Sequence, residues 1–218
     1  LEYVDIFYSH RVDEKTPMEE TAAALAQAVQ SGKALYVGIS SYSSERTQAM
    51  VELLREWKIP LLIHQPSYNL LNRWVDKSGL LDTLEQNGVG CIAFTPLAQG
   101  LLTGKYLNGI PEGSRMQTEG KKARGLTEKM LSESNLNSLR LLNDMAQQRG
   151  QSMAQMALSW LLKDRRVTSV LIGASRPEQI EENVKALENL SFSAEELTQI
   201  DKHVADGQLN LWQASSDK

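Results

Sequence analysis

The chain has 218 residues, of which 41% are hydrophobic and 23% are charged, with 14 glycines and 6 prolines. This is an ordinary globular composition, which excludes collagen-like, low-complexity and disordered chains. The 23 basic and 27 acidic residues give a net charge of −4, so we expect neither a nucleic-acid partner nor a membrane partner. Each apolar run is shorter than the roughly 18 residues of a membrane helix. The single cysteine, Cys91, indicates a reducing compartment, and we predict a cytoplasmic protein.

Five short apolar runs, rich in β-branched and aromatic residues, predict strands of a parallel sheet buried on both faces. They span Tyr3–Ser9, Ala34–Ile39, Pro60–His64, Val89–Phe94 and Thr168–Ile172. Helical patterns separate and follow them, over residues 16–32, 44–57, 77–87, 134–149, 152–163, 175–187 and 193–204. This alternation is typical of right-handed βαβ units. We therefore predict a single α/β domain over residues 1–218, with a polar C-terminal tail at 205–218.

Residues 100–133 form a long polar stretch that is rich in glycine and lacks strong periodicity. A stretch of this kind inside a compact domain is usually a functional loop. Its start, Gly100–Tyr106, resembles a phosphate-binding P-loop, but the spacing is one residue short and Tyr106 replaces the Ser or Thr that binds magnesium. We therefore reject a P-loop and predict no metal site.

Two architectures fit the predicted elements: a doubly wound open sheet, or part of a (β/α)₈ barrel. No Gly-x-Gly-x-x-Gly motif follows any predicted strand, which counts against a Rossmann nucleotide site. The residues that follow the five strands are polar, aromatic or glycine: Ser9-His10, Ser40-Ser41, His64-Gln65, Phe94-Thr95-Pro96 and Gly173-Ala174-Ser175. Since barrel enzymes place their chemistry at the C-terminal ends of the strands, this coincidence favours the barrel.

At these strand ends the sequence resembles the aldo-keto reductase family. The matching stretches are Tyr3–His10, Val37–Ser41, Ile63–Asn69, Ala93–Tyr106 and Leu171–Asn183. Within the family, the chain is similar to the branch of potassium-channel β-subunits and bacterial L-glyceraldehyde 3-phosphate reductases. It looks closer to the reductases, because His10 stands where the channel subunits carry Asn. The resemblance implies a (β/α)₈ barrel of which this chain supplies about the last five βα units, so we expect an N-terminally incomplete domain.

The resemblance also implies roles for the residues at the strand ends. Of the family's catalytic tetrad, only His10 has a counterpart here, and it would hydrogen-bond the substrate carbonyl. Ser40, Ser41 and Gln65 match positions that bind the nicotinamide carboxamide, with Ser41 in place of the commoner Asn. Phe94 matches the aromatic residue that stacks on the nicotinamide ring, where a flat π-face is what the stacking requires.

The remaining matches concern the phosphates and the adenosine of the cofactor. The loop that wraps the pyrophosphate is matched by Thr95, Leu97, Gln99, Thr103 and Lys105, and the stretch 100–133 is expected to cover the cofactor. The adenosine end is matched by Gly173, Ser175, Gln179, Glu182 and Asn183. Many family members carry Lys and Arg where this chain has Ala174 and Gln179. Arg115 could supply the missing charge, and we favour NADP over NAD.

Three functions stay open on the sequence alone. The first is NADPH-dependent reduction of small aldehydes, such as L-glyceraldehyde 3-phosphate and methylglyoxal-like carbonyls. The second is a cofactor-loaded regulatory or scaffolding subunit with little activity. The third is an inactive fragment, because the catalytic Tyr, Lys and Asp of the family have no counterpart here. The resemblance implies a homo-oligomer, a tetramer or an octamer, with a small aldehyde as the bound partner.

Overall fold

The computed structural model describes residues 1–112 and 128–204. Its centre is one parallel sheet whose five strands follow one another in chain order. The strands are β1 (Val4–Ser9), β2 (Ala34–Ser40), β3 (Leu61–Gln65), β4 (Gly90–Phe94) and β5 (Ser169–Leu171). Each pairs in parallel with the next. Because the order never reverses, the sheet has no switch point, and the doubly wound alternative is wrong.

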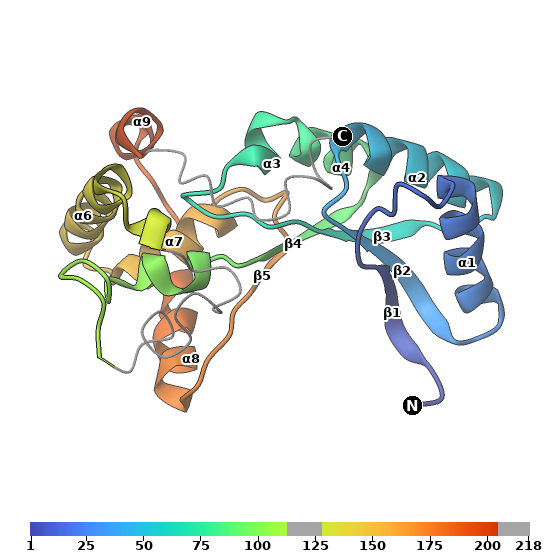
Figure 1. Cartoon of the computed structure of the whole chain (residues 1–218), viewed down its shortest axis with the longest axis horizontal. Helices are drawn as coiled ribbons and strands as arrows, with labels where there is room; N and C mark the ends of the chain where they lie inside the picture. The colour runs from blue at the N-terminus through green and yellow to red at the C-terminus, as the bar shows by residue number, and fades with distance from the viewer. Residues whose placement is uncertain (113–127, 205–218) are drawn as a thin grey trace.

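Helices connect the strands along the outer side of the curved sheet, and the whole forms an open arc (Figure 1). The helices of the first half are α1 (Met18–Gln30), α2 (Ser44–Glu56), α3 (Trp74–Lys77) and α4 (Leu80–Asn87). Those of the second half are α6 (Glu133–Gln148), α7 (Met153–Leu162), α8 (Pro177–Val184) and α9 (Ala194–His203). A sequential parallel sheet with helices on its outer side is the arrangement of a partial (β/α)₈ barrel.

The helix boundaries follow from local capping chemistry. The hydroxyl of Ser43 accepts a hydrogen bond from the amide of Arg46 and begins α2. Ser152 with Gln155, and Ser193 with Glu196, form capping boxes that begin α7 and α9. Such reciprocal bonds satisfy amides that would otherwise lack partners at a helix N-terminus.

Three sequence expectations need correction. The helix predicted over residues 77–87 begins only at Leu80, as α4, because Gly79 has a φ of +73° that separates it from the short α3. The stretch 100–133 has regular structure near its ends, in two short 3₁₀ helices, η1 (Ala98–Thr103) and η3 (Glu128–Leu131). Its middle, including Arg115, falls outside the described residues, as does the tail 205–218.

The third correction concerns burial. The sheet is not covered on both faces, because Phe7, Leu35, Tyr36 and Leu171 are each about half exposed. The core lies between the sheet and the helices, where Val37, Ile39, Cys91 and Ala93 are fully buried. The apolar runs therefore predicted the strands correctly, but the prediction that both faces of the sheet are buried was wrong.

Candidate functional site

Four side chains at the C-terminal half of the sheet share one face. Tyr8 lies opposite Gly38, and Ser40, two residues further along β2, lies opposite Gln65. Since side chains alternate along a strand, the register places Tyr8, Ser40 and Gln65 on the same face. His64 pairs with Cys91, so the next residue, Gln65, is on the same face of the sheet as Phe94 of β4. His10 follows the end of β1 and is exposed.

Tyr8, Gly38 and Gln65 fit closely against one another. Burial raises the pKa of Tyr8, and a hydrogen bond to the side chain of Gln65 opposes that rise. A Cβ at Gly38 would lie 2.5 Å from Cε1 of Tyr8, so the tyrosine ring rests directly on the glycine. The hydroxyl of Ser40 donates to the carbonyl oxygen of Gln65 at 2.7 Å. These contacts fix the two neighbouring strand ends relative to each other.

Ser41 has an unusual conformation at the end of β2. Its φ is +57°, in the left-handed region that non-glycine residues rarely adopt. The residue is 1% exposed, and its hydroxyl has no hydrogen-bond partner among the described residues. A buried hydroxyl without a partner carries a free-energy cost, and such groups cluster at functional sites. Ser41, which is predicted to bind the nicotinamide carboxamide, thus has both a strained backbone and an unpartnered buried hydroxyl.

A buried polar network holds the end of β4. The side-chain oxygens of Ser67 and Thr95 lie 3.0 Å apart, and the Asn69 amide donates to the carbonyl of Thr95 at 2.9 Å. The amide of Phe94 donates to the carbonyl of Pro66 at 2.9 Å. The resemblance to the family included Ser67 and Asn69 but implied no role for them. The signal was a run of polar residues directly after a buried strand.

The loop that follows β4 has a compact backbone. Thr95, Ala98, Gln99 and Gly100 all have positive φ angles, and the hydroxyl of Thr103 donates to the carbonyl of Gly100 at 2.7 Å. The amides of Ala98 and Gly100 donate to the carbonyl oxygens of Thr95 and Leu97 at 2.9 and 2.8 Å, so the turn is held by its own backbone.

Lys105 adds a charge to this loop. A Cβ at Gly100 would lie 2.8 Å from the Lys105 ammonium, which also lies 5.0 Å from the centre of the Tyr106 ring. Lys105 and Thr103 are exposed, whereas Leu97 packs against the core. The loop therefore combines a fixed backbone with an accessible positive charge.

A second loop lies beside it, because β5 pairs with β4. It leads through Gly173 and Ser175 into α8. The side-chain oxygen of Gln179 accepts a hydrogen bond from the amide of Ser175 at 2.8 Å, and lies 3.3 Å from its hydroxyl. Further along α8, Glu182 is exposed and Asn183 is buried. The structure thus brings the two segments that are predicted to bind the phosphates and the adenosine to adjacent strand ends.

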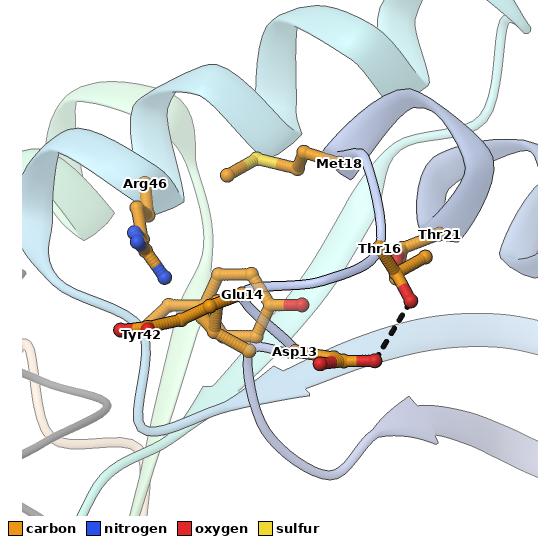
Figure 2. Close-up of a pocket in the computed structure, with 8 residues that line it drawn as sticks. Asp13, Glu14, Thr16, Met18, Thr21, Tyr42 and Arg46 are labelled. Carbon is orange, nitrogen blue, oxygen red and sulfur yellow. Dashed lines mark hydrogen bonds between the residues drawn. The ribbon is translucent and has the colours of Figure 1, made fainter.

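A cavity of about 170 Å³ lies between the loop after β1 and the start of α2. Figure 2 shows Arg46 reaching from α2 toward this loop. Asp13 holds the loop by accepting a hydrogen bond from the Thr16 hydroxyl at 2.7 Å, and Tyr42 also lines the cavity. None of its lining residues is an expected cofactor contact, so the cavity is distinct from the face that carries Ser40 and Gln65.

Within residues 1–112 and 128–204, no group of three or more His, Cys, Asp or Glu side chains is arranged to hold a metal ion. None of the helices described in the structure is long and apolar enough to cross a membrane.

Comparison with known proteins extends these observations. The sequence profile of the Aldo/keto reductase family matches residues 1–205. An L-glyceraldehyde 3-phosphate reductase of Escherichia coli O157:H7 is 87% identical over 218 residues, which are the whole of this chain and 63% of that protein. A putative voltage-gated potassium channel subunit beta of Schizosaccharomyces pombe is 38% identical over 93% of this chain and 59% of its own length. The chain thus spans about three-fifths of these relatives.

Solved structures show the same likeness. The glycerol dehydrogenase of Gluconobacter oxydans superposes with a TM-score of 0.72 at 28% identity, over 96% of this chain and 61% of that one. A thermostable aldo-keto reductase in complex with the inhibitor epalrestat superposes with a TM-score of 0.68, also at 28% identity. That superposition covers 92% of this chain and 60% of the other.

Proposed function

This chain belongs to the aldo/keto reductase family, and from that premise we propose that the full-length protein reduces small aldehydes to alcohols with NADPH. The observation that carries the proposal is the shared face at the strand ends, where the register aligns Ser40 with Gln65 and puts Phe94 on the same face. This set joins hydrogen-bonding groups to a flat aromatic ring, which suits a nicotinamide and its carboxamide.

Two further observations support the proposal that these residues bind a dinucleotide. The free hydroxyl of Ser41 is a polar atom still available at the carboxamide end. The Lys105 ammonium, beside the left-handed backbone at Gln99 and Gly100, suits a diphosphate through its charge. When bound, NADPH supplies the hydride that reduces the carbonyl carbon. In this proposal the chain's own residues hold the nicotinamide ring and fix which of its faces meets the substrate.

His10 acts on the substrate side in this proposal. It follows β1, whose C-terminal end adjoins that of β2, and its side chain is open to solvent. An imidazole at this position can donate a hydrogen bond to the carbonyl oxygen and hold the aldehyde for proton transfer. The group that gives the proton would be the family's tyrosine, which has no counterpart in these 218 residues.

The name of the Escherichia coli relative supports L-glyceraldehyde 3-phosphate as one substrate. We further propose that methylglyoxal-like carbonyls are accepted, that the protein is a cytoplasmic homo-oligomer of four or eight subunits, and that it needs no metal. The similarity to the Schizosaccharomyces pombe channel subunit supports the second candidate, a cofactor-loaded regulatory subunit. His10 favours the enzyme, because it can polarise a carbonyl.

One experiment separates these candidates. The purified full-length protein is mixed with NADPH and with either L-glyceraldehyde 3-phosphate, unphosphorylated glyceraldehyde or methylglyoxal, and the loss of NADPH absorbance is followed. We expect aldehyde-dependent oxidation, faster with NADPH than with NADH. Tight NADPH binding without oxidation by any aldehyde would favour the regulatory subunit, and absence of both would reject the proposal.

A further inference from the structure

A hydrogen-bonded chain joins three strand ends on the helix side of the sheet. The hydroxyl of Tyr42 lies 2.8 Å from the hydroxyl oxygen of Ser9, 33 residues earlier. Nε2 of His64 lies 3.2 Å from the amide nitrogen of Tyr42 and 3.2 Å from its carbonyl oxygen. Either tautomer of a neutral imidazole therefore makes a hydrogen bond to the Tyr42 backbone. Ser9, Tyr42 and His64, which we call the clamp, thus connect the ends of β1, β2 and β3.

Each member of the clamp is the sequence neighbour of an expected site residue. Ser9 precedes His10, Tyr42 follows Ser41, and His64 precedes Gln65. Because successive residues of a strand point to opposite faces, a contact between His64 and the end of β2 sets the position of Gln65 on the other face. The clamp is therefore placed to fix the substrate side and the carboxamide side of the site relative to each other.

The Ser9 hydroxyl holds the backbone on both sides of His10. It donates to the carbonyl oxygen of Arg11 at 3.3 Å, which leaves the Tyr42 hydroxyl as the donor in the bond to Ser9. The bond from Ser9 to Arg11 spans His10, and the bond from Tyr42 holds the Ser9 hydroxyl in place. A residue held between two bonded neighbours loses backbone freedom, and this freedom is what an exposed strand end otherwise has.

Two members of the clamp are shielded from competing water. Tyr42 is 2% exposed and His64 is fully buried. Burial lowers the pKa of His64 to about 3, with the backbone hydrogen bond to Tyr42 opposing the change, so the ring is neutral at physiological pH. A hydrogen bond inside such an environment is stronger than one at the surface, and losing one partner leaves a buried group unsatisfied.

We infer that Tyr42 is a positioning residue for His10: its hydroxyl, through Ser9, fixes the imidazole relative to Ser41 and Gln65. The inference rests on the proposed function for the role of His10. It predicts that removing the Tyr42 hydroxyl lowers turnover and leaves cofactor affinity nearly unchanged. A displacement of about 1 Å at a reacting group is enough for a large loss of rate.

The test uses the full-length protein with Tyr42→Phe, Ser9→Ala and the double variant. We expect each single change to lower kcat about tenfold, with the Kd for NADPH within about twofold of the wild-type value. Because both changes remove the same bond, the double variant should be no slower than the slower single one. Ser9→Thr retains the hydroxyl and should recover most of the lost turnover.

A matched control measures the cost of removing any buried hydroxyl. Tyr68 is 3% exposed, packs edge-on against Trp160 at 5.5 Å, and is not a member of the clamp. Tyr68→Phe should therefore leave kcat within about twofold of the wild type. Equal losses in Tyr42→Phe and Tyr68→Phe would overturn the inference, as would unchanged kcat in Tyr42→Phe and Ser9→Ala.

A measurement that needs no activity keeps the inference separate from the proposed function. Crystal structures of the wild-type protein and Tyr42→Phe should show the His10 side chain displaced or split between positions in the variant. If the wild-type protein reduces no aldehyde, the proposed function fails, and the two structures still decide the inference. An identical His10 position in both would reject it.

Discussion

The side-chain oxygen of Gln179 occupies the hydrogen-bonding groups of Ser175, accepting from its amide at 2.8 Å and lying 3.3 Å from its hydroxyl oxygen. These are the donors at the start of α8 that would bind the 2′-phosphate in the proposed complex. Phosphate oxygens would therefore compete with Gln179 for the same donors. The preference for NADPH over NADH should depend on how easily this side chain moves aside and on the local charge.

We predict that Gln179→Arg raises the preference for NADPH over NADH about tenfold, which corresponds to about 1.4 kcal/mol. The substitution frees the Ser175 donors and adds a cation that can bind phosphate with two hydrogen bonds. The measurement is the ratio of Kd values for NADH and NADPH, by fluorescence titration of the full-length protein. Glu181→Gln is the control, because it changes the charge of α8 equally at an exposed residue. A similar rise in both variants would mean that net charge alone is responsible.

His10→Ala should lower kcat by about a hundredfold or more, in the range of positioned acid–base groups, without weakening NADPH binding. The imidazole would contact the carbonyl of the substrate and not the dinucleotide, so the loss belongs to the transition state. Steady-state kinetics and a separate NADPH titration check both parts. His203→Ala, at an exposed histidine on α9, should have wild-type kinetics. Normal turnover with weak NADPH binding in His10→Ala would contradict the assigned role.

The sequence was sufficient for the strands, because β-branched apolar runs alternated with helical patterns, and the polar strand ends favoured the barrel over the doubly wound sheet. It was also sufficient to place Ser40, Gln65 and Phe94 at strand ends. The clamp could not be predicted from the sequence, since Tyr42 and Ser9 are 33 residues apart and only the strand register brings them together. No role was predicted for Tyr42 or Tyr8 from the sequence, and their hydrogen bonds to Ser9 and Gln65 appear only in the fold.

Backbone conformation was the other limit of sequence reasoning. Ser41, Thr95, Ala98 and Gln99 adopt positive φ angles without being glycine. Local preference argues against that conformation for each of them, so tertiary contacts must impose it. Gly79 is the opposite case, because a glycine inside a helical pattern signals a break that the prediction of a single helix over 77–87 overlooked.

Gly38→Ala should destabilise the protein by about 1–3 kcal/mol, the usual cost of overpacking. The new methyl group would lie 2.5 Å from the Tyr8 ring and would push the tyrosine away from Gln65. Urea denaturation of the full-length protein measures the change, and NADPH affinity should fall with it. In a Tyr8→Ala background the same substitution should cost much less, because the clashing ring is gone. An equal cost in both backgrounds would show that Tyr8 is not the cause.

His64 should make the protein less stable as the pH falls from 7 to 5. Burial lowers the pKa of His64 from 6.5 to about 3. Between pH 6.5 and pH 3, His64 is therefore protonated in the unfolded chain and neutral in the folded chain. Stability from this group is therefore complete above pH 6.5, and about 2 kcal/mol is lost by pH 5. Urea denaturation at both pH values measures the loss in the wild-type protein and in His64→Gln, which cannot titrate. The variant should be less stable than the wild type at pH 7 and should lose about 2 kcal/mol less on acidification. An equal pH dependence in both proteins would mean that other groups carry it.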